Sequence, residues 1–110
     1  FIEASEAEIR AAAAVGANII ELHTGRYCHD GSGRAAELTR ISKAAELADA
    51  LGLECHGGHG LDFATVGAIA AIPQMRELNI GHFLMGEAMF SGIDKAITEM
   101  RRLMDEARLS

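Results

Sequence analysis

The 110-residue sequence contains no tryptophan, one tyrosine, one proline and only two lysines, and its formal net charge is −6. Proteins that bind nucleic acid usually display a basic patch or stripe, so we do not expect a nucleic-acid partner. The same shortage of basic residues argues against adsorption to an anionic membrane surface. No run of about 18 apolar residues is present, and the first residues lack the features of a signal peptide. We therefore expect a soluble protein of the cytoplasm.

Cysteine is also scarce, and its spacing excludes two common uses. Cys28 and Cys55 lie far apart in the sequence, without a C-x-x-C pattern. Neither a zinc ribbon nor a redox-active pair is therefore indicated. We expect both to be reduced thiols, which is the usual state in the cytosol.

Apolar residues make up 49% of the sequence, which is enough to build a hydrophobic core. A chain of this length forms one ordinary domain, so we expect residues 1–110 to be a single domain. Capping signals and helical spacing of apolar residues predict helices at residues 5–15, 35–51 and 62–71, and a last helix after a capping box at residues 91–94. Asp62 is the expected N-cap of the third helix.

Short apolar runs between these helices predict strands at residues 19–23, 53–56 and 78–82, whereas residues 26–33 read as a loop. Helices and strands that alternate in this way form parallel sheets, so the predicted class is α/β. Polar and glycine-rich clusters follow each strand. Proteins of the α/β class bind ligands at the carboxyl ends of their strands, so we expect a site at these clusters.

The first polar cluster contains Glu21 and His23, which alternation in a strand places on the same face. A carboxylate and an imidazole are unusual in so apolar a run, since burying a charge without a partner is costly. They form either a satisfied polar pair or part of a site.

The second cluster, residues 51–61, is the stretch in which we most expect chemistry. Its apolar start leads into a loop with Gly57, Gly58 and Gly60 and with His56 and His59, before a helix begins. Glycines allow close approach of a ligand to the backbone, and a helix start favours an anion such as phosphate or carboxylate. The alternative is a connecting loop that contains a packed histidine.

Two other interpretations of these motifs are weaker. Residues 31–36 fit the dinucleotide-binding pattern G-x-G-x-x-A, but their first glycine does not directly follow the predicted strand. His56 and His59 lack a clear third ligand, so no metal site is predicted. The Cys28–His29 segment is most simply a solvated loop.

Several stretches together resemble the pyridoxine 5'-phosphate synthase family: residues 1–4, 20–25, 58–61 and 77–86. The resemblance runs over the whole length, with the four stretches in the family's order and spacing. Members of this family are TIM barrels, and the chain resembles their C-terminal half, from the tail of the fifth strand through units six to eight. A complete (β/α)₈ barrel needs roughly 250 residues, so the length agrees with a fragment. An open half-barrel is expected to self-associate or to need its other half.

The resemblance implies condensation of 3-amino-2-oxopropyl phosphate with 1-deoxy-D-xylulose 5-phosphate to give pyridoxine 5'-phosphate, phosphate and water. It assigns His59 as proton donor and Glu21 as transition-state stabiliser, without a metal or organic cofactor. Gly60, Gly81 and His82 fall on positions that hold the aminoketone phosphate. The resemblance also implies a homo-oligomer.

The chain departs from the family pattern in the second cluster, and much of the site is missing. Family members often carry Asn or His at the position of His56 and Ala at that of Gly57. Their other catalytic residues and most contacts to the sugar phosphate belong to the N-terminal half. The alternative function is therefore a non-catalytic α/β half-barrel that binds a phosphorylated metabolite or only assembles with another chain.

Overall fold

A parallel sheet lies at the centre of the computed structural model, which describes residues 1–29 and 31–109. Strand β1 (Ile19–His23) pairs with β2 (Glu54–Gly58), and β2 pairs with β3 (Met75–Asn79). Both pairings are parallel, and helices connect successive strands. The predicted α/β class and parallel sheet are confirmed, and the arrangement is consistent with half of a barrel.

The N-terminal residues extend the sheet beyond β1. Ile2 forms an isolated parallel bridge with Leu22. Its N–H donates to the carbonyl of Glu21 at 2.8 Å, and its carbonyl accepts from the N–H of His23 at 2.9 Å. A short segment before the first helix thus occupies the place of an additional strand, as the expected tail of a preceding strand would.

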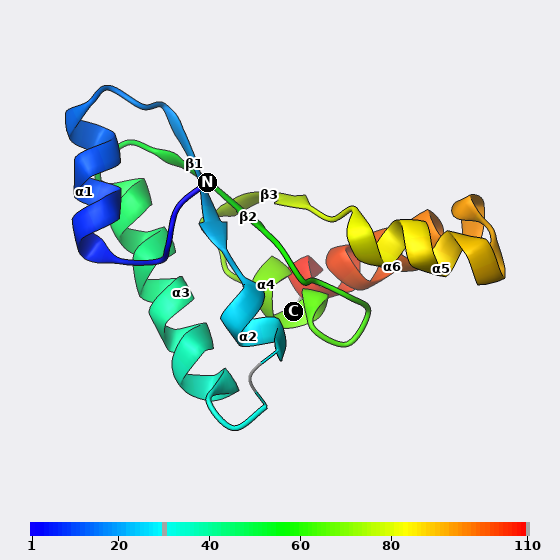
Figure 1. The fold of residues 1–110 in the computed structure, drawn as a ribbon. Helices are drawn as coiled ribbons and strands as arrows, with labels where there is room; N and C mark the ends of the chain where they lie inside the picture. Colours follow the sequence, from blue (N-terminus) through cyan, green and yellow to red (C-terminus); the bar gives the residue numbers. More distant parts are fainter. Residues whose placement is uncertain (30, 110) are drawn as a thin grey trace.

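Helices cover one face of this sheet, and a helical hairpin extends away from it (Figure 1). The helices are α1 (Glu6–Ala14), α2 (Gly25–His29), α3 (Arg34–Ala50), α4 (Val66–Ala70), α5 (His82–Ser91) and α6 (Ile93–Leu109). Apolar residues of α1, α3 and α4 join the hydrophobic core against the sheet. The hairpin consists of α5 and α6, and α6 also packs against α4.

The strands contribute alternate residues to the core. Ile20 and Leu22 of β1, Cys55 of β2 and Met75 of β3 are each at most 5% exposed and pack in one cluster with the helices. Full burial of an aliphatic side chain of this size contributes about 1.5–3 kcal/mol. The intervening residues of the same strands face the opposite, open side of the sheet.

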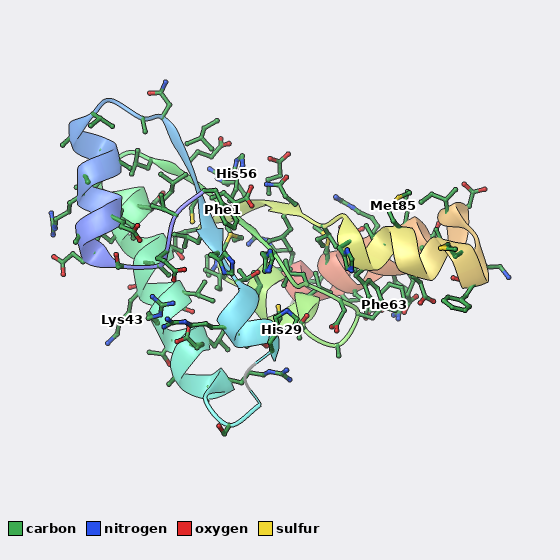
Figure 2. All side chains as sticks on the ribbon, in the orientation of Figure 1. Phe1, His29, Lys43, His56, Phe63 and Met85 are labelled. Atoms are coloured by element: carbon green, nitrogen blue, oxygen red, sulfur yellow. The ribbon has the colours of Figure 1, made fainter. Side chains whose placement is uncertain are left out.

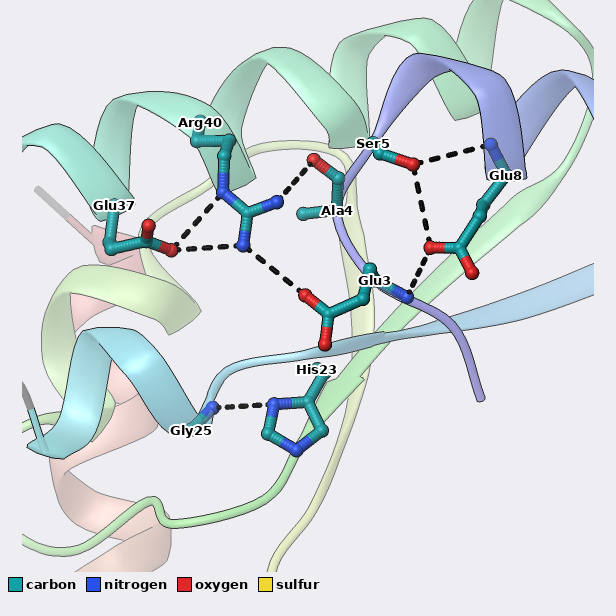
Figure 3. A network of polar contacts seen from close by, with 8 residues as sticks. All are labelled: Glu3, Ala4, Ser5, Glu8, His23, Gly25, Glu37 and Arg40. Atoms are coloured by element: carbon teal, nitrogen blue, oxygen red, sulfur yellow. Dashed lines mark hydrogen bonds and ion pairs between the residues drawn. The ribbon is translucent and has the colours of Figure 1, made fainter.

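The predicted cap of α1 by Ser5 is confirmed, but the Glu8 carboxylate bonds Glu3 instead of completing the capping box at Ser5 (Figure 3). The Ser5 Oγ accepts the N–H of Glu8 at 3.3 Å, and a carboxylate oxygen of Glu8 accepts the N–H of Glu3 at 3.0 Å. From α3, Arg40 donates to the carbonyl of Ala4 at 3.0 Å. These bonds satisfy free groups at the helix start and connect α1 to α3.

The predicted helices at residues 5–15 and 35–51 agree with α1 and α3 to within one residue at each end. Gly16 and Gly52 follow these helices with φ of +86° and +78°. Such left-handed positions after a helix favour glycine, which explains why both glycines mark the ends correctly.

The helix after the glycine-rich loop is shorter than predicted. Helix α4 begins at Val66, with Thr65 as its N-cap, so the assignment of Asp62 as N-cap is wrong. The Asp62 Oδ1 instead accepts from the N–H of Thr65 at 2.9 Å and from its Oγ1 at 2.8 Å. The carboxylate therefore closes a turn that precedes the helix. Asp side chains commonly bond nearby backbone N–H groups in this way, which offers the backbone an alternative to a helix.

The predicted third strand, residues 78–82, is wrong by three residues. Strand β3 ends at Asn79, and His82 is the first residue of α5, with Gly81 as N-cap. An irregularity in the β2–β3 register places Arg76 as an extra residue between the partners of Cys55 and His56. Simple alternation cannot detect such a bulge, and the apolar run after Asn79 suits a strand or a helix equally.

The second predicted capping box, residues 91–94, is also wrong. Ser91 is the last residue of α5, and its Oγ donates to the carbonyl of Glu87 at 3.1 Å. Gly92, with φ of +90°, separates the two helices. The short helix α2 likewise occupies part of the predicted 26–33 loop; residue 30 of that loop lies outside the described residues.

The hairpin leaves apolar surface uncovered. Of the predicted apolar face of α6, Ala96 and Met100 are buried, but Ile93 and Ile97 are about half exposed. Met85 is 65% exposed on α5, away from the sheet (Figure 2). Large apolar side chains exposed on both helices of the hairpin favour packing of another element against it. No helix in the described part of the chain is both long and apolar enough to cross a membrane.

Candidate functional site

The carboxyl ends of the three strands meet at one edge of the sheet. There His23 lies opposite Gly58, and Gly58 lies opposite Asn79. Two residues earlier along each strand, Glu21 lies opposite His56, and His56 lies opposite Glu77. The open face of the sheet is therefore polar over two successive levels, as expected for a ligand site at strand ends.

His59 directly follows β2 and has a left-handed backbone, with φ of +90°. Residues with a side chain rarely adopt this conformation, and they do so mostly where neighbouring contacts enforce it. The fully buried Thr24 supplies such contacts: its Oγ1 lies 2.7 Å from the carbonyl oxygen of His59 and 2.9 Å from that of Gly58. The end of β1 thus holds the loop that carries His59.

The absence of a side chain at Gly25 creates room for two imidazoles. A Cβ at this position would collide with the ring of His23 and would lie 2.8 Å from Cδ2 of His59. The two rings stack, with centroids 4.4 Å apart and an interplanar angle of 30°. The N–H of Gly25 donates to Nδ1 of His23 at 3.1 Å (Figure 3).

The Glu21 carboxylate lies against both neighbouring strands. One oxygen accepts from the side-chain amide of Asn79 at 2.5 Å, and the other would be only 2.5 Å from a Cβ at Gly58. The carboxylate is therefore placed over the residue that precedes His59. Burial alternates along β1, which confirms that Glu21 and His23 share a face.

His56 takes part in a separate network below this level. Its Nε2 lies 2.6 Å from a carboxylate oxygen of Glu54, and its Nδ1 lies 2.9 Å from one of Glu77. The imidazole is nearly buried, whereas both carboxylates are at least half exposed. His56 therefore links β2 to β3 and does not pair with His59. No group of three His, Cys, Asp or Glu side chains suited to a metal ion occurs within residues 1–29 and 31–109.

Both cysteines are free thiols, as predicted. Burial raises the pKa of Cys55 to about 11 and also raises the pKa of Cys28, although the hydrogen bonds of Cys28 with Thr65 and Thr24 oppose the shift. Because the thiolate is the reactive form, neither cysteine is activated as a nucleophile at neutral pH.

A pocket of about 660 Å³ opens beside these strand ends. His59 and Gly60 line it from the loop after β2, and Gly81 and His82 line it from the start of α5. The pocket therefore unites four of the five predicted site residues. Its volume is in the range of sites for small metabolites.

Comparison with known proteins identifies the family. A family model described as "Pyridoxal phosphate biosynthesis protein PdxJ" matches residues 1–106. The chain belongs to the PdxJ family. Its relatives include proteins named pyridoxine 5'-phosphate synthase from Caulobacter sp. (strain K31), Roseobacter denitrificans and Rhodospirillum rubrum, which are 58%, 55% and 55% identical to it.

The PdxJ-family chain corresponds to less than half of these relatives. The three alignments cover 99%, 98% and 97% of the chain but only 45%, 45% and 44% of the respective relatives. The resemblance expected from the short motifs is thus confirmed over almost the whole chain. The relatives are long enough to contain a second part of comparable size.

The structure also brings residues to the candidate site that the sequence did not reveal. Asn79 lines the pocket and bonds Glu21, so it connects the predicted carboxylate to the pocket. The predicted strand ended at residue 82, so Asn79 was not recognised as a strand-end residue. Strand β3 in fact ends at Asn79, which lies opposite Gly58. Thr24 was missed as well. A hydroxyl residue between a strand and a glycine was the available signal.

Proposed function

We propose that this chain provides the C-terminal half of the active site of a pyridoxine 5'-phosphate synthase with a complete TIM barrel. The enzyme condenses 3-amino-2-oxopropyl phosphate with 1-deoxy-D-xylulose 5-phosphate and releases pyridoxine 5'-phosphate, inorganic phosphate and water. The observation that carries the proposal is the pocket in which His59, Gly60, Gly81 and His82 meet. Membership of the PdxJ family and the names of the relatives support it.

Gly60, Gly81 and His82 hold the phosphate of the aminoketone in this proposal. Gly60 has φ of +80°, and a Cβ there would lie 3.0 Å from Nε2 of His29, so its backbone comes close to α2. Helix α5 starts at His82 beside the pocket. The free N–H groups of its first turn and the positive end of its dipole favour an anion. The His82 imidazole adds a hydrogen-bond donor.

His59 acts as the general acid of ring closure. An oxygen of the condensing substrates must leave as water, and it needs a proton when its bond to carbon breaks. An imidazole can donate and regain a proton near neutrality. The ring of His59 is exposed and borders the pocket, so it is accessible to a bound substrate.

Glu21 stabilises the cationic iminium that forms when the amine meets the ketone. Its carboxylate is already oriented by Asn79 and lies over Gly58. A charge fixed before the reaction does not need to reorganise as the substrate becomes positive, and each such group can lower a barrier by roughly 3 kcal/mol.

The remaining half of the barrel closes the open side of the sheet in this proposal. Its residues supply the sugar-phosphate contacts and complete the catalytic set, without a metal or an organic cofactor. The uncovered apolar surface of the α5–α6 hairpin supports packing against another part of the protein. The assembled enzyme works in the cytoplasm as a homo-oligomer.

The test measures pyridoxine 5'-phosphate formation by the full-length protein, that is, the 110 residues joined to the rest of the barrel. His59→Asn should reduce turnover by about 10²-fold or more while leaving aminoketone phosphate binding nearly intact. His56→Asn is the matched control, because His56 lies outside the pocket and family members carry Asn there; its turnover should stay near wild type. Turnover of His59→Asn near the wild-type value would remove His59 as the acid.

A full-length wild-type protein that forms no product from the two substrates would overturn the synthase function. Binding of the aminoketone phosphate without turnover would then favour the non-catalytic alternative.

The phosphate site is tested by calorimetry with the same full-length protein. His82→Ala should weaken aminoketone phosphate binding about tenfold, since hydrogen bonds to charged groups contribute about 1.5–3 kcal/mol. Met85→Ala, also on α5 but exposed and outside the pocket, should leave the affinity unchanged. Equal affinities for the wild type and His82→Ala would exclude His82 from the site.

A further inference from the structure

A row of aromatic rings crosses the strand ends beside the proposed acid. His23 lies between Phe1 and His59, with ring centroids 5.0 Å and 4.4 Å away. The contact with Phe1 is edge-to-face, whereas the contact with His59 is stacked at 30°. His59 also meets the edge of the His29 ring, with centroids 6.4 Å apart. His23 is therefore the residue that covers one face of the His59 ring.

The orientation of His23 is itself fixed. Its Nδ1 accepts the N–H of Gly25 at 3.1 Å, which requires a lone pair on Nδ1 and places the ring proton on Nε2. Gly25 is fully packed between the two histidines, and any Cβ there would displace them. His23 thus presents a ring face of fixed orientation to His59.

The backbone contacts leave the His59 ring itself unrestrained. Thr24 binds the carbonyl of His59 and thereby supports its left-handed backbone. No hydrogen bond to a ring nitrogen of His59 is found within residues 1–29 and 31–109. Among these residues, the His59 ring stacks on the ring of His23 and occupies the space above Gly25. Placing a catalytic group wrongly by about 1 Å can cost on the order of 10²-fold in rate.

We infer that His23 is a positioning residue for His59, and this inference rests on the proposed role of His59 as the acid. His23 stacks on a residue that lines the pocket and does not itself line it, so the role we assign to it is exerted through His59. Its stacked ring holds the His59 imidazole in the plane from which the proton is delivered.

The variant that separates this role from a structural one is His23→Asn. The Asn side-chain oxygen can still accept the N–H of Gly25, so the local turn is retained, while the ring face is lost. In the full-length protein, kcat should fall about tenfold or more, with KM for the aminoketone phosphate within about twofold of wild type. A kcat within twofold of wild type would overturn the inference, as would equal losses in kcat and in affinity.

A double-variant cycle tests whether His23 acts through His59. His23→Asn should lower turnover strongly in the wild type but not further in the His59→Asn background, because the group that it positions is already absent. An equal fold-change in both backgrounds would show that His23 acts independently and would overturn the inference.

NMR gives a readout that does not depend on activity. Ring protons of His23 and His59 should show a mutual nuclear Overhauser contact in the wild-type protein, and the His59 signals should lose their ring-current shift in His23→Asn. Absence of the contact in the wild type would overturn the stacked pair even if catalysis were found. Lack of synthase activity with the contact present would instead overturn the proposed function, and the positioning role with it, while leaving the stacked geometry established.

Discussion

The two faces of the sheet differ although the same strands build both. On the helix-covered face, Ile20, Leu22 and Cys55 are at most 4% exposed and contact apolar residues. On the open face, their neighbours Glu21 and His56 are hydrogen-bonded to polar side chains. Because side chains alternate along a strand, one face of the sheet packs in the core and the other carries the polar groups of the candidate site. Changes on the covered face should act on folding, and changes at the site on the open face should act on turnover.

Two adjacent residues of β1, Leu22 and Glu21, should differ most in their effect on the free energy of unfolding. Leu22→Ala in the full-length protein should lower the free energy of unfolding by about 2–5 kcal/mol, because it leaves a cavity in a fully buried position. Glu21→Gln keeps the shape of a partly exposed side chain and should change that free energy by less than about 1 kcal/mol.

The two variants should rank in the opposite order for turnover. Folded Leu22→Ala should keep most of its activity, whereas Glu21→Gln should lose about 10²-fold. Denaturant unfolding and steady-state kinetics measure the two effects. A Glu21→Gln variant that is active but strongly destabilised would mean that the open face serves folding, and the division between the faces would then be wrong.

The covered face was largely predictable from sequence because hydrophobic periodicity encodes it. The β1 strand was found with its bounds. Helix α1 was found through its capping box and terminal glycine, and α3 through the helical spacing of its apolar residues and its terminal glycine. The prediction failed where local signals conflict. A bulge at Arg76 shifts the register of β3, and the apolar run at residues 80–84 resembles a strand until Gly81 starts a helix.

The open face was predictable in composition but not in geometry. Motifs identified His59, Gly60, Gly81 and His82, and the structure brings them to one pocket. The support for these residues depends on contacts between segments distant in sequence, such as Thr24 with the loop after β2. No periodicity or spacing reveals such contacts, because they arise only when the strands pair.

Cys55 allows the covered face to be tested by pH. Burial raises the pKa of its thiol from about 9 to about 11, so the folded state retains a proton that the unfolded state loses in this range. The corresponding stability is complete below pH 9 and is lost as the pH rises toward 11, by roughly 2–3 kcal/mol. The Cys55→Ala variant of the full-length protein should therefore show a flatter decline in unfolding free energy.

Cys28→Ala is the matched control for this titration. Its pKa is raised too, but the thiol is only partly buried, so removing it should flatten the decline less. Unfolding free energies measured between pH 8 and pH 11 compare the variants. An identical pH dependence for the wild type and Cys55→Ala would show that the thiol of Cys55 is not protected from water.

Two adjacent glycines of β2, Gly57 and Gly58, allow the two faces to be compared by adding a single methyl group to each. A Cβ at Gly57 would point toward the covered face, 3.1 Å from Sδ and 3.3 Å from Cε of Met75. The end of a methionine side chain can adapt, and family members often carry Ala at this position. Gly57→Ala should therefore change both stability and turnover only slightly.

Gly58→Ala adds the same methyl group on the open face, with a different expected result. Its Cβ would lie 2.5 Å from a carboxylate oxygen of Glu21 and 3.1 Å from the carbonyl oxygen of Asn79, and that carbonyl is backbone and cannot yield as a side chain does. The carboxylate must therefore move away from the residue that precedes His59. In the full-length protein we expect turnover to fall about tenfold or more, since the charge is no longer oriented before the reaction. Kinetics of the two Ala variants measured side by side decide the point, because equal turnover in both would show that the position of Glu21 over β2 does not matter for catalysis.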